Sequence, residues 1–254
     1  MILRRLSEAV RRQDWFVVVL EVAIVVVGIF IGLQVNDWNE ERLERKHEGE
    51  LLVRLHDEIV GNVLYFQEEA EDKLDLLQAL ENSIKLIVDP PTAREPSVED
   101  LRGLSLMSRY PSISPRTAVQ TEMAADGGLR VISSVIIRQK MAAYLSELSF
   151  IQKQLEYFRD GATVNYSEER LIAAGIGRSY APEQRERSRV TFDLEKLTNT
   201  NEIRSFLLTG LRDQAIFSFY IQDVLVATSE LCQTLAEQVD AGSCPDVSAT
   251  MERF

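Results

Sequence analysis

Apolar residues run almost without interruption from Trp15 to Leu33, and Glu21 is the only charged residue among these 19 positions. An apolar run of about 18 or more residues is long enough to cross the hydrocarbon core of a bilayer as a helix. Trp15 begins the run and Trp38 follows it, and tryptophan side chains are stable in the headgroup layers. The pattern predicts a transmembrane helix at residues 15–35.

The sequence leaves two other interpretations of this segment, and both fit less well. A cleaved signal peptide has a shorter apolar core, followed by small residues at the cleavage site. The stretch 22–33 has such a length, but the bulky and polar residues 34–38 follow it. A buried helix of a soluble protein needs a polar side for water, whereas β-branched residues cover every face of this one. We therefore expect an uncleaved anchor in the lipid bilayer.

Basic residues flank the predicted span on both sides. Four arginines lie in the short tail of residues 1–14, and three basic residues follow shortly after the span. The positive-inside rule then places the tail in the cytoplasm. Residues 36–254 are expected to form one helical-bundle domain on the other side of the membrane.

Three residues inside the predicted span are candidates for contacts with another helix. Glu21 is an ionisable group at a costly depth, where it snorkels, is protonated or forms a hydrogen bond with a partner helix. Gly28 and Gly32 form a G-x-x-x-G pair, which permits close approach between two helix backbones. A homo-oligomer or a partner membrane protein would use these positions, although the pattern also arises by chance in apolar sequence.

Beyond the span, apolar residues recur in steps of three and four, which is the period of a helix. An 11-residue repeat is visible as Leu55, Phe66, Leu77 and Val88. A period near 3.67 residues per turn implies a nearly straight helix. We predict that this helix, which can be continuous with the anchor, ends at Val88 because two prolines follow at positions 90–91.

The rest of the chain is also patterned as helices, and strand alternation nowhere extends beyond a few residues. Ser97 and Asp100 have the spacing of a helix-capping box. The expected segments are short helices at 97–107 and 117–125, a long helix at 133–172, an exposed loop at 178–191 and a long helix at 200–239. The sequence therefore predicts an all-α fold, in which an N-terminal transmembrane helix continues into an antiparallel bundle of about three long helices with short connecting helices.

Composition narrows the functional classes. The net charge is −12 and no basic stripe interrupts it, so nucleic-acid binding is not expected. The two cysteines, Cys232 and Cys244, either remain thiols in a reducing compartment or form a disulfide outside the membrane. A turn at residues 241–242 would bring them together, but sequence alone does not fix that geometry.

The usual signatures of catalysis and metal binding are missing from the sequence. His47 and His56 are the only histidines, and their spacing on a helix points them to different sides. No H-E-x-x-H, phosphate-binding loop or G-x-S-x-G sequence occurs. The acidic residues between Glu68 and Asp75 are explained by a solvated helix face. We therefore predict no catalytic residue, no cofactor and no metal site.

The segment from Gly28 to Arg42 reads G-I-F-I-G-L-Q-V-N-D-W-N-E-E-R. It resembles a bacterial family of single-pass membrane proteins with a G-I-x-I-x-L-Q-x-N-x-W-N-E-x-R signature at the exit of an N-terminal transmembrane helix. Residues 128–132 are similar to a looser element that precedes the family's central long helix. The family is catalogued as a domain of unknown function. The resemblance implies a bacterial membrane protein and carries no activity to transfer. Together with the orientation from the flanking charges, it leads us to expect an inner-membrane protein with most of its chain in the periplasm.

Four residues of this signature form a membrane-exit motif. Gln34, Asn36 and Asn39 offer amides to headgroups or to a neighbouring chain, and Trp38 fixes the depth of the helix. Two roles remain open at this stage. The motif either defines only the membrane interface, or Gln34 and Asn36 form hydrogen bonds between protomers.

Three functional hypotheses follow from these observations. The leading one is a non-enzymatic, membrane-anchored helical protein that acts by protein–protein interaction or as a scaffold. The second is a small-ligand sensor domain that signals through a partner protein, because helical bundles can bind ligands between their helices. The third is an enzyme whose site has no recognisable sequence signature.

Overall fold

The computed structural model describes residues 15–89, 95–179, 189–198 and 201–254, so the tail predicted at residues 1–14 lies outside the described residues. Helices dominate the described part, which confirms the all-α class. The chain divides into two compact units, Met1–Leu51 and Leu52–Phe254. Helix α2 (Trp15–Val88) contributes residues to both units.

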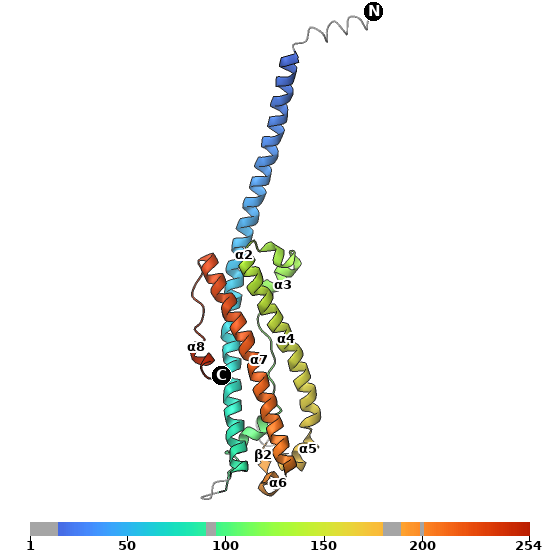
Figure 1. The fold of residues 1–254 in the computed structure, drawn as a ribbon, viewed down its shortest axis with the longest axis vertical. Coiled ribbons are helices and arrows are strands. Elements are labelled where there is room, and N and C mark those ends of the chain that lie inside the picture. Colours follow the sequence, from blue (N-terminus) through green and yellow to red (C-terminus); the bar gives the residue numbers. More distant parts are fainter. Residues whose placement is uncertain (1–14, 90–94, 180–188, 199–200) are drawn as a thin grey trace, which may run out of the picture. The chain divides into compact units, whose positions relative to one another are not determined.

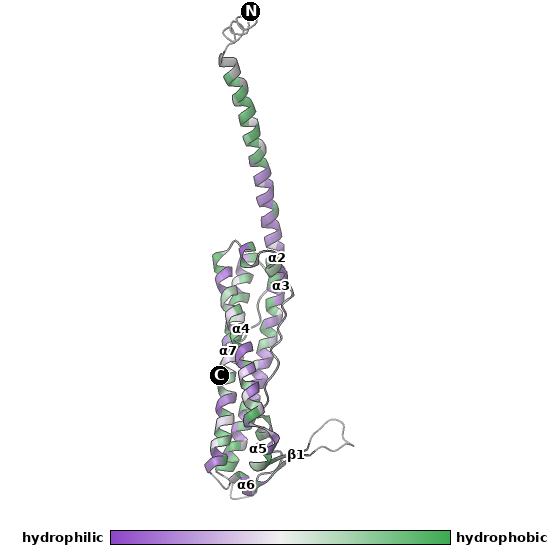
Figure 2. Ribbon diagram, turned by 90° about the vertical axis from the view of Figure 1, so that its right-hand side faces the viewer, coloured by the Kyte–Doolittle hydropathy of each residue, from purple (hydrophilic) through white to green (hydrophobic). Residues whose placement is uncertain are grey.

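In the first unit, α2 presents its apolar side chains to the outside, and every residue from Val22 to His47 is exposed. Figure 2 shows a hydrophobic band along this helix, followed by a hydrophilic one. Two described helices are long and apolar enough to cross a membrane by length and composition, α2 and α7 (Asn201–Val239). None of the apolar window of α2 is buried, whereas half of that of α7 is, because α7 belongs to the core of the second unit.

Three long helices form the second unit: α2 from Leu52 onward, α4 (Val135–Asn165) and α7 (Figure 1). Helix α7 runs opposite to α2, since Gln214 contacts Lys73 and Cys232, further along α7, lies beside His56. Helix α4 instead runs in the same direction as α2. The expected alternation of direction therefore holds for α7 but not between α2 and α4.

The parallel pair arises because the chain after α2 returns along that helix before α4 begins. Two α2 side chains satisfy the backbone of the returning segment, as an extended chain without a sheet partner requires. The Tyr65 hydroxyl donates to the Ser112 carbonyl (2.7 Å), and Asn62 receives the Arg116 N–H (2.7 Å) and donates to the Arg116 carbonyl (2.9 Å). As the segment advances from Ser112 to Arg116, its partners on α2 lie nearer the N-terminus of that helix. Helix α4 therefore starts beside the N-terminal end of the part of α2 that belongs to the second unit.

Glu58 then fixes the start of α3 (Ala118–Ala125), the short helix predicted at 117–125. Its carboxylate accepts the backbone N–H groups of Val119 (2.7 Å) and Gln120 (3.3 Å), which no intrahelical carbonyl can satisfy. A negative charge at this position is also favoured by the helix dipole. A side chain from α2 thus caps a helix about 60 residues later in the chain.

The ends of the elements follow local sequence signals. Helix α2 ends at Val88 as predicted. Ser97 and Asp100 form the reciprocal bonds of a capping box, although the helix that follows is only a 3₁₀ turn, η1 (Arg102–Leu106). A second 3₁₀ turn, η2 (Gly128–Val131), precedes α4, whose first turn is capped by the Ser134 hydroxyl.

The helix predicted at 133–172 instead ends at Asn165, and the region after it differs from the expected loop. A short helix α5 (Glu168–Ala173) leads into an antiparallel hairpin of β1 (Ile176–Ser179) and β2 (Arg189–Phe192). Strands of four residues are too short to show alternation in a sequence, which is why the hairpin was missed. Helix α6 (Leu194–Thr198) connects it to α7, and α8 (Ser248–Met251) ends the fold.

The buried face of α4 agrees with the predicted apolar stripe at seven positions, from Ile137 to Phe158. Ile136 and Leu145, also assigned to that stripe, are exposed. Along α2 the 11-residue repeat breaks after Phe66. Burial continues at seven-residue intervals, and the positions in this series are Phe66, Lys73, Leu80 and Ile87.

Candidate functional site

The residues predicted to act at the membrane lie in the first unit. Gln34, Asn36, Trp38 and Asn39 are all exposed on α2. A side chain added at Gly28 or Gly32 would meet nothing within 4 Å, so both glycines are open to an approaching helix. The side chain of Glu21 lies outside the described residues. The roles assigned to these seven residues stay predictions.

A buried lysine in the second unit forms a site that the sequence did not indicate. Lys73 lies on α2 and is only 3% exposed. Its Nζ is 5.0 Å from the centre of the Tyr110 ring and 4.9 Å from that of Phe217. Aromatic faces attract a cation, and they do so more strongly when it is shielded from water. The ammonium makes no ion pair with a carboxylate in the described part of the chain.

Among the described residues, Gln214 is the hydrogen-bond partner of this ammonium. It is fully buried on α7, and its Oε1 accepts from Lys73 Nζ. Its amide nitrogen donates to the carbonyls of Met107 (2.7 Å) and Arg109 (3.3 Å). These two bonds fix which end of the amide faces the lysine. Three segments of the fold therefore meet around the ammonium.

Burial lowers the pKa of Lys73 to about 7. An ammonium loses its hydration in this environment, and two rings with one amide oxygen do not replace that hydration in full. The side chain therefore changes its charge state near neutral pH. Ion pairing with a negative group would favour the charged form and raise the pKa again.

Lys73 also lines a pocket of about 580 Å³, which is a ligand-sized volume. Arg109 adds a second cationic side chain to the wall. Glu69, Asp72 and Asp75 contribute carboxylates, and desolvation followed by the charge of Asp72 raises the pKa of Glu69. The pocket thus combines a poorly compensated cation with crowded carboxylates. The remaining lining residues are Leu76, Leu106, Pro111 and Ser112.

The sequence did hold one signal for this site. Lys73 lies seven residues after Phe66 and seven before Leu80, both of which are fully buried. Positions seven residues apart lie on the same face of a helix, so a lysine midway between two buried apolar residues is a candidate for a buried amine. The 11-residue repeat instead leads from Phe66 to Leu77, which placed Lys73 among the acidic residues assigned to the solvated face.

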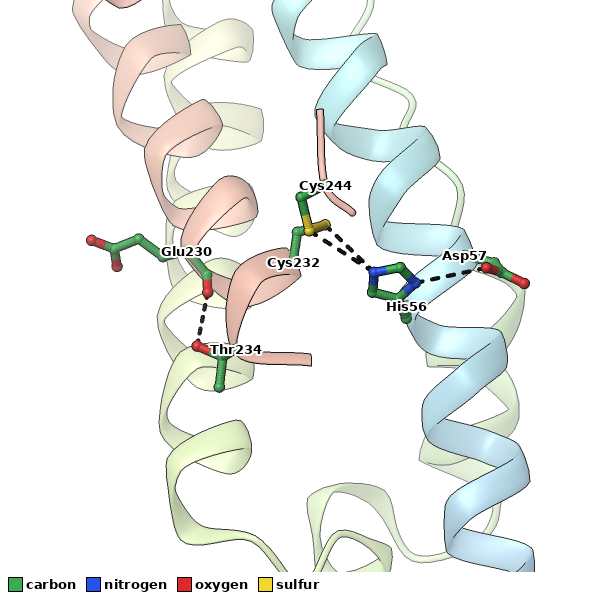
Figure 3. The surroundings of a disulfide bond; sticks show 6 residues. All are labelled: His56, Asp57, Glu230, Cys232, Thr234 and Cys244. Atoms are coloured by element: carbon green, nitrogen blue, oxygen red, sulfur yellow. Dashed lines mark hydrogen bonds and ion pairs between the residues drawn. A yellow bond between two sulfur atoms is a disulfide. The ribbon is translucent and has the colours of Figure 1, made fainter. Parts of the chain in front are cut away.

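A second cluster joins the two cysteines to a histidine (Figure 3). Cys232 and Cys244 form a disulfide with a Cα–Cα distance of 6.0 Å. The Nε2 atom of His56 lies 4.0 Å from the Cys232 sulfur and 3.9 Å from the Cys244 sulfur. His56 is 2% exposed, and its Nδ1 is 3.7 Å from an Asp57 carboxylate oxygen.

Sequence reasoning missed this cluster because it compared His56 with His47 rather than with the cysteines. His56 and Cys232 are 176 positions apart, and only the antiparallel packing of α7 on α2 brings them together. Neither site can be assigned by comparison, since the chain matches no family model, no curated protein and no solved structure.

Proposed function

We propose that this chain is a single-pass membrane protein whose helical bundle binds a small zwitterionic molecule of the amino-acid class. The protein acts as a sensor, without catalysis, and passes the binding event to a partner protein. The observation that carries the proposal is Lys73, a buried ammonium that lines a ligand-sized pocket and has no carboxylate partner among the described residues.

The anchor half of the proposal is supported by the exposed apolar residues of α2. A continuous set of such side chains in water would be an aggregation hazard, whereas lipid stabilises it. The membrane-exit residues resemble those of bacterial inner-membrane proteins. The proposed topology has residues 1–14 in the cytoplasm and the bundle in the periplasm.

Extraction of membranes at alkaline pH tests the anchor. We expect the full chain to stay in the membrane pellet, and a Val25→Arg/Ile29→Arg variant to move largely to the soluble fraction. Each arginine near the middle of a span costs roughly 2.5–3.5 kcal/mol of insertion free energy. The control is Leu43→Arg, at an exposed α2 position beyond the predicted span. Complete release of the wild-type chain, with its N-terminus intact, would contradict the anchor.

The chemistry of the pocket supports a ligand with both charges. A carboxylate beside Lys73 and Arg109 would compensate the buried ammonium. Desolvation and then the charge of Asp72 raise the pKa of Glu69, and an ammonium on the same ligand would relieve the repulsion between these two carboxylates. A simple anion would compensate the ammonium of Lys73, but the carboxylates of Glu69 and Asp72 would repel it. The volume suits a molecule of modest size.

Calorimetric titration of the full chain in detergent tests the ligand class. The probes are the common L-amino acids, with the amide and the N-acetyl derivative of each as controls that lack one charge. We expect at least one amino acid to bind, with both of its derivatives at least tenfold weaker. Lys73→Met should lower the affinity at least tenfold, while Lys85→Met, at an exposed position of the same helix, leaves it unchanged.

The affinity should also depend on pH. The carboxylate needs a protonated Lys73, whose pKa is about 7 in the free protein. Binding should therefore weaken by about tenfold for each pH unit above 7, and change little below it. Equal binding by wild type and Lys73→Met, or no binding by any amino acid, contradicts the proposal.

Protein–protein interaction, the leading expectation from the sequence, is compatible with a sensor and remains a prediction. Nothing in the described part of the chain packs against Gly28 or Gly32, so a second copy of the anchor helix could approach closely there. Self-association of the anchor is therefore the kind of protein–protein interaction that we favour.

A further inference from the structure

We propose that reduction of the Cys232–Cys244 disulfide converts this cluster into a binding site for Zn²⁺, with two thiolates and the His56 imidazole as ligands. This site is separate from the Lys73 pocket and does not depend on the function proposed for it. The fold would thus hold a covalent bond in its oxidised form and a metal centre in its reduced form.

The position of His56 already suits a metal ion. In a tetrahedral zinc site, Zn–N is about 2.0–2.1 Å and Zn–S about 2.3 Å, which places each sulfur about 3.6 Å from the nitrogen. The observed distances from Nε2 are 4.0 and 3.9 Å, and they are nearly equal. Figure 3 shows the imidazole from α2 directed at both sulfurs. The ring needs to move by only a few tenths of an ångström.

The sulfurs must separate further than the imidazole must move. They are about 2.05 Å apart in a disulfide and about 3.7 Å apart as neighbouring ligands of zinc. Cys232 is fully buried on α7, so it forms the fixed side of the site. Cys244 lies in residues 241–247, which form neither helix nor strand and are not held by a ladder of backbone hydrogen bonds. A shift of Cys244 can therefore open the site.

The other nitrogen of His56 has an environment that suits ligation. Nδ1 is buried and has no hydrogen-bond partner among the described residues, and an oxygen of Asp57 is 3.7 Å away. A histidine that binds zinc through Nε2 carries its proton on Nδ1. A carboxylate near that proton orients the ring and increases its basicity. Asp57 can provide this support after a small rotation.

The chemistry balances with a dithiol as reductant. The S–S bond breaks, each cysteine sulfur gains a hydrogen, and the dithiol gives up two electrons and two protons as it closes to a cyclic disulfide. Zn²⁺ then displaces the two thiol protons. Two thiolates balance the charge of the cation, and the neutral imidazole leaves the complex uncharged, which suits a buried position. Water completes the tetrahedron.

Zinc titration of the full chain in detergent tests the site. The protein is reduced with dithiothreitol, freed of reductant without air, and titrated in competition with a chromophoric zinc indicator. We expect the reduced chain to bind one equivalent of Zn²⁺ and the oxidised chain none. Co²⁺ in place of Zn²⁺ should give the thiolate-to-metal absorption that reports direct sulfur ligation.

Variants separate the ligands from their surroundings. His56→Ala should weaken zinc binding by more than 100-fold, and Asp57→Asn by about 10–100-fold as an orienting group. His47→Ala is the matched control and should bind as wild type, because His47 is exposed and nine residues away. Circular dichroism of each reduced variant establishes that the helices persist. The proposal is overturned if a helical His56→Ala protein binds zinc like wild type, or if the reduced wild type binds none.

Discussion

Replacing Lys73 by methionine should stabilise this protein, and the gain should disappear as the pH rises. We expect the free energy of unfolding to increase by about 3 kcal/mol at pH 6. Methionine fills similar space and carries no charge that requires hydration. Part of the benefit is offset because Gln214 Oε1 loses its donor, at a cost of roughly 1–2 kcal/mol.

The dependence on pH follows from the lowered pKa of Lys73, which burial shifts to about 7 in the folded chain from 10.5 for a lysine in water. Below pH 7 both folded and unfolded states carry the proton, so the full penalty of burying the ammonium is present. Between pH 7 and 10.5 only the unfolded state binds the proton, and the stability of wild type rises with pH. The advantage of Lys73→Met should therefore shrink by roughly 4 kcal/mol between pH 6 and 10.

Denaturant unfolding of the full chain in detergent, followed by circular dichroism at both pH values, measures this effect. Lys85→Met, on the same helix but exposed, should change the free energy of unfolding by less than about 0.5 kcal/mol. A destabilised Lys73→Met at pH 6 would show that the lysine is a structural element. A stabilised variant that no longer binds ligand would instead indicate a site retained for function at the expense of stability.

Substitution of Gly103 by alanine should have the opposite and equally large effect. Gly103 is buried in η1, where the returning chain crosses α2. An added Cβ would lie 2.1 Å from the Ala79 carbonyl oxygen and 2.7 Å from the Leu80 nitrogen. Both are backbone atoms of a helix, so they cannot move aside as a side-chain end would.

We expect Gly103→Ala to lower the free energy of unfolding by about 3 kcal/mol, since overpacking of this kind forces backbone shifts. For a unit of this size the midpoint of thermal unfolding should fall by roughly 6–12 °C. Gly161→Ala is the control, because a Cβ there, near the end of α4, would meet a single side-chain atom, at 4.0 Å. It should raise stability by up to about 1 kcal/mol. Equal effects of the two substitutions would disprove the close approach at Gly103.

Much of the secondary structure was accessible from sequence because its signals are local. Two prolines end α2 at Val88, and the apolar period of α4 names seven of its buried residues. The capping box at Ser97 was also recognised from spacing, although the helix after it closes as a short 3₁₀ turn. The hairpin 176–192 was missed, since its strands are stabilised by pairing with each other rather than by a pattern of their own.

Periodicity, charge and proline act over a few residues, and they were enough to indicate an apolar segment able to span a bilayer, an all-α fold and the ends of α2 and α7. The parallel course of α2 and α4, the burial of Lys73 and the approach of His56 to the disulfide arise from tertiary contacts. The physical reason is the return of residues 107–117 along α2, which depends on side-chain bonds such as that between Asn62 and Arg116. Such contacts join residues far apart in the chain, and no local pattern specifies them.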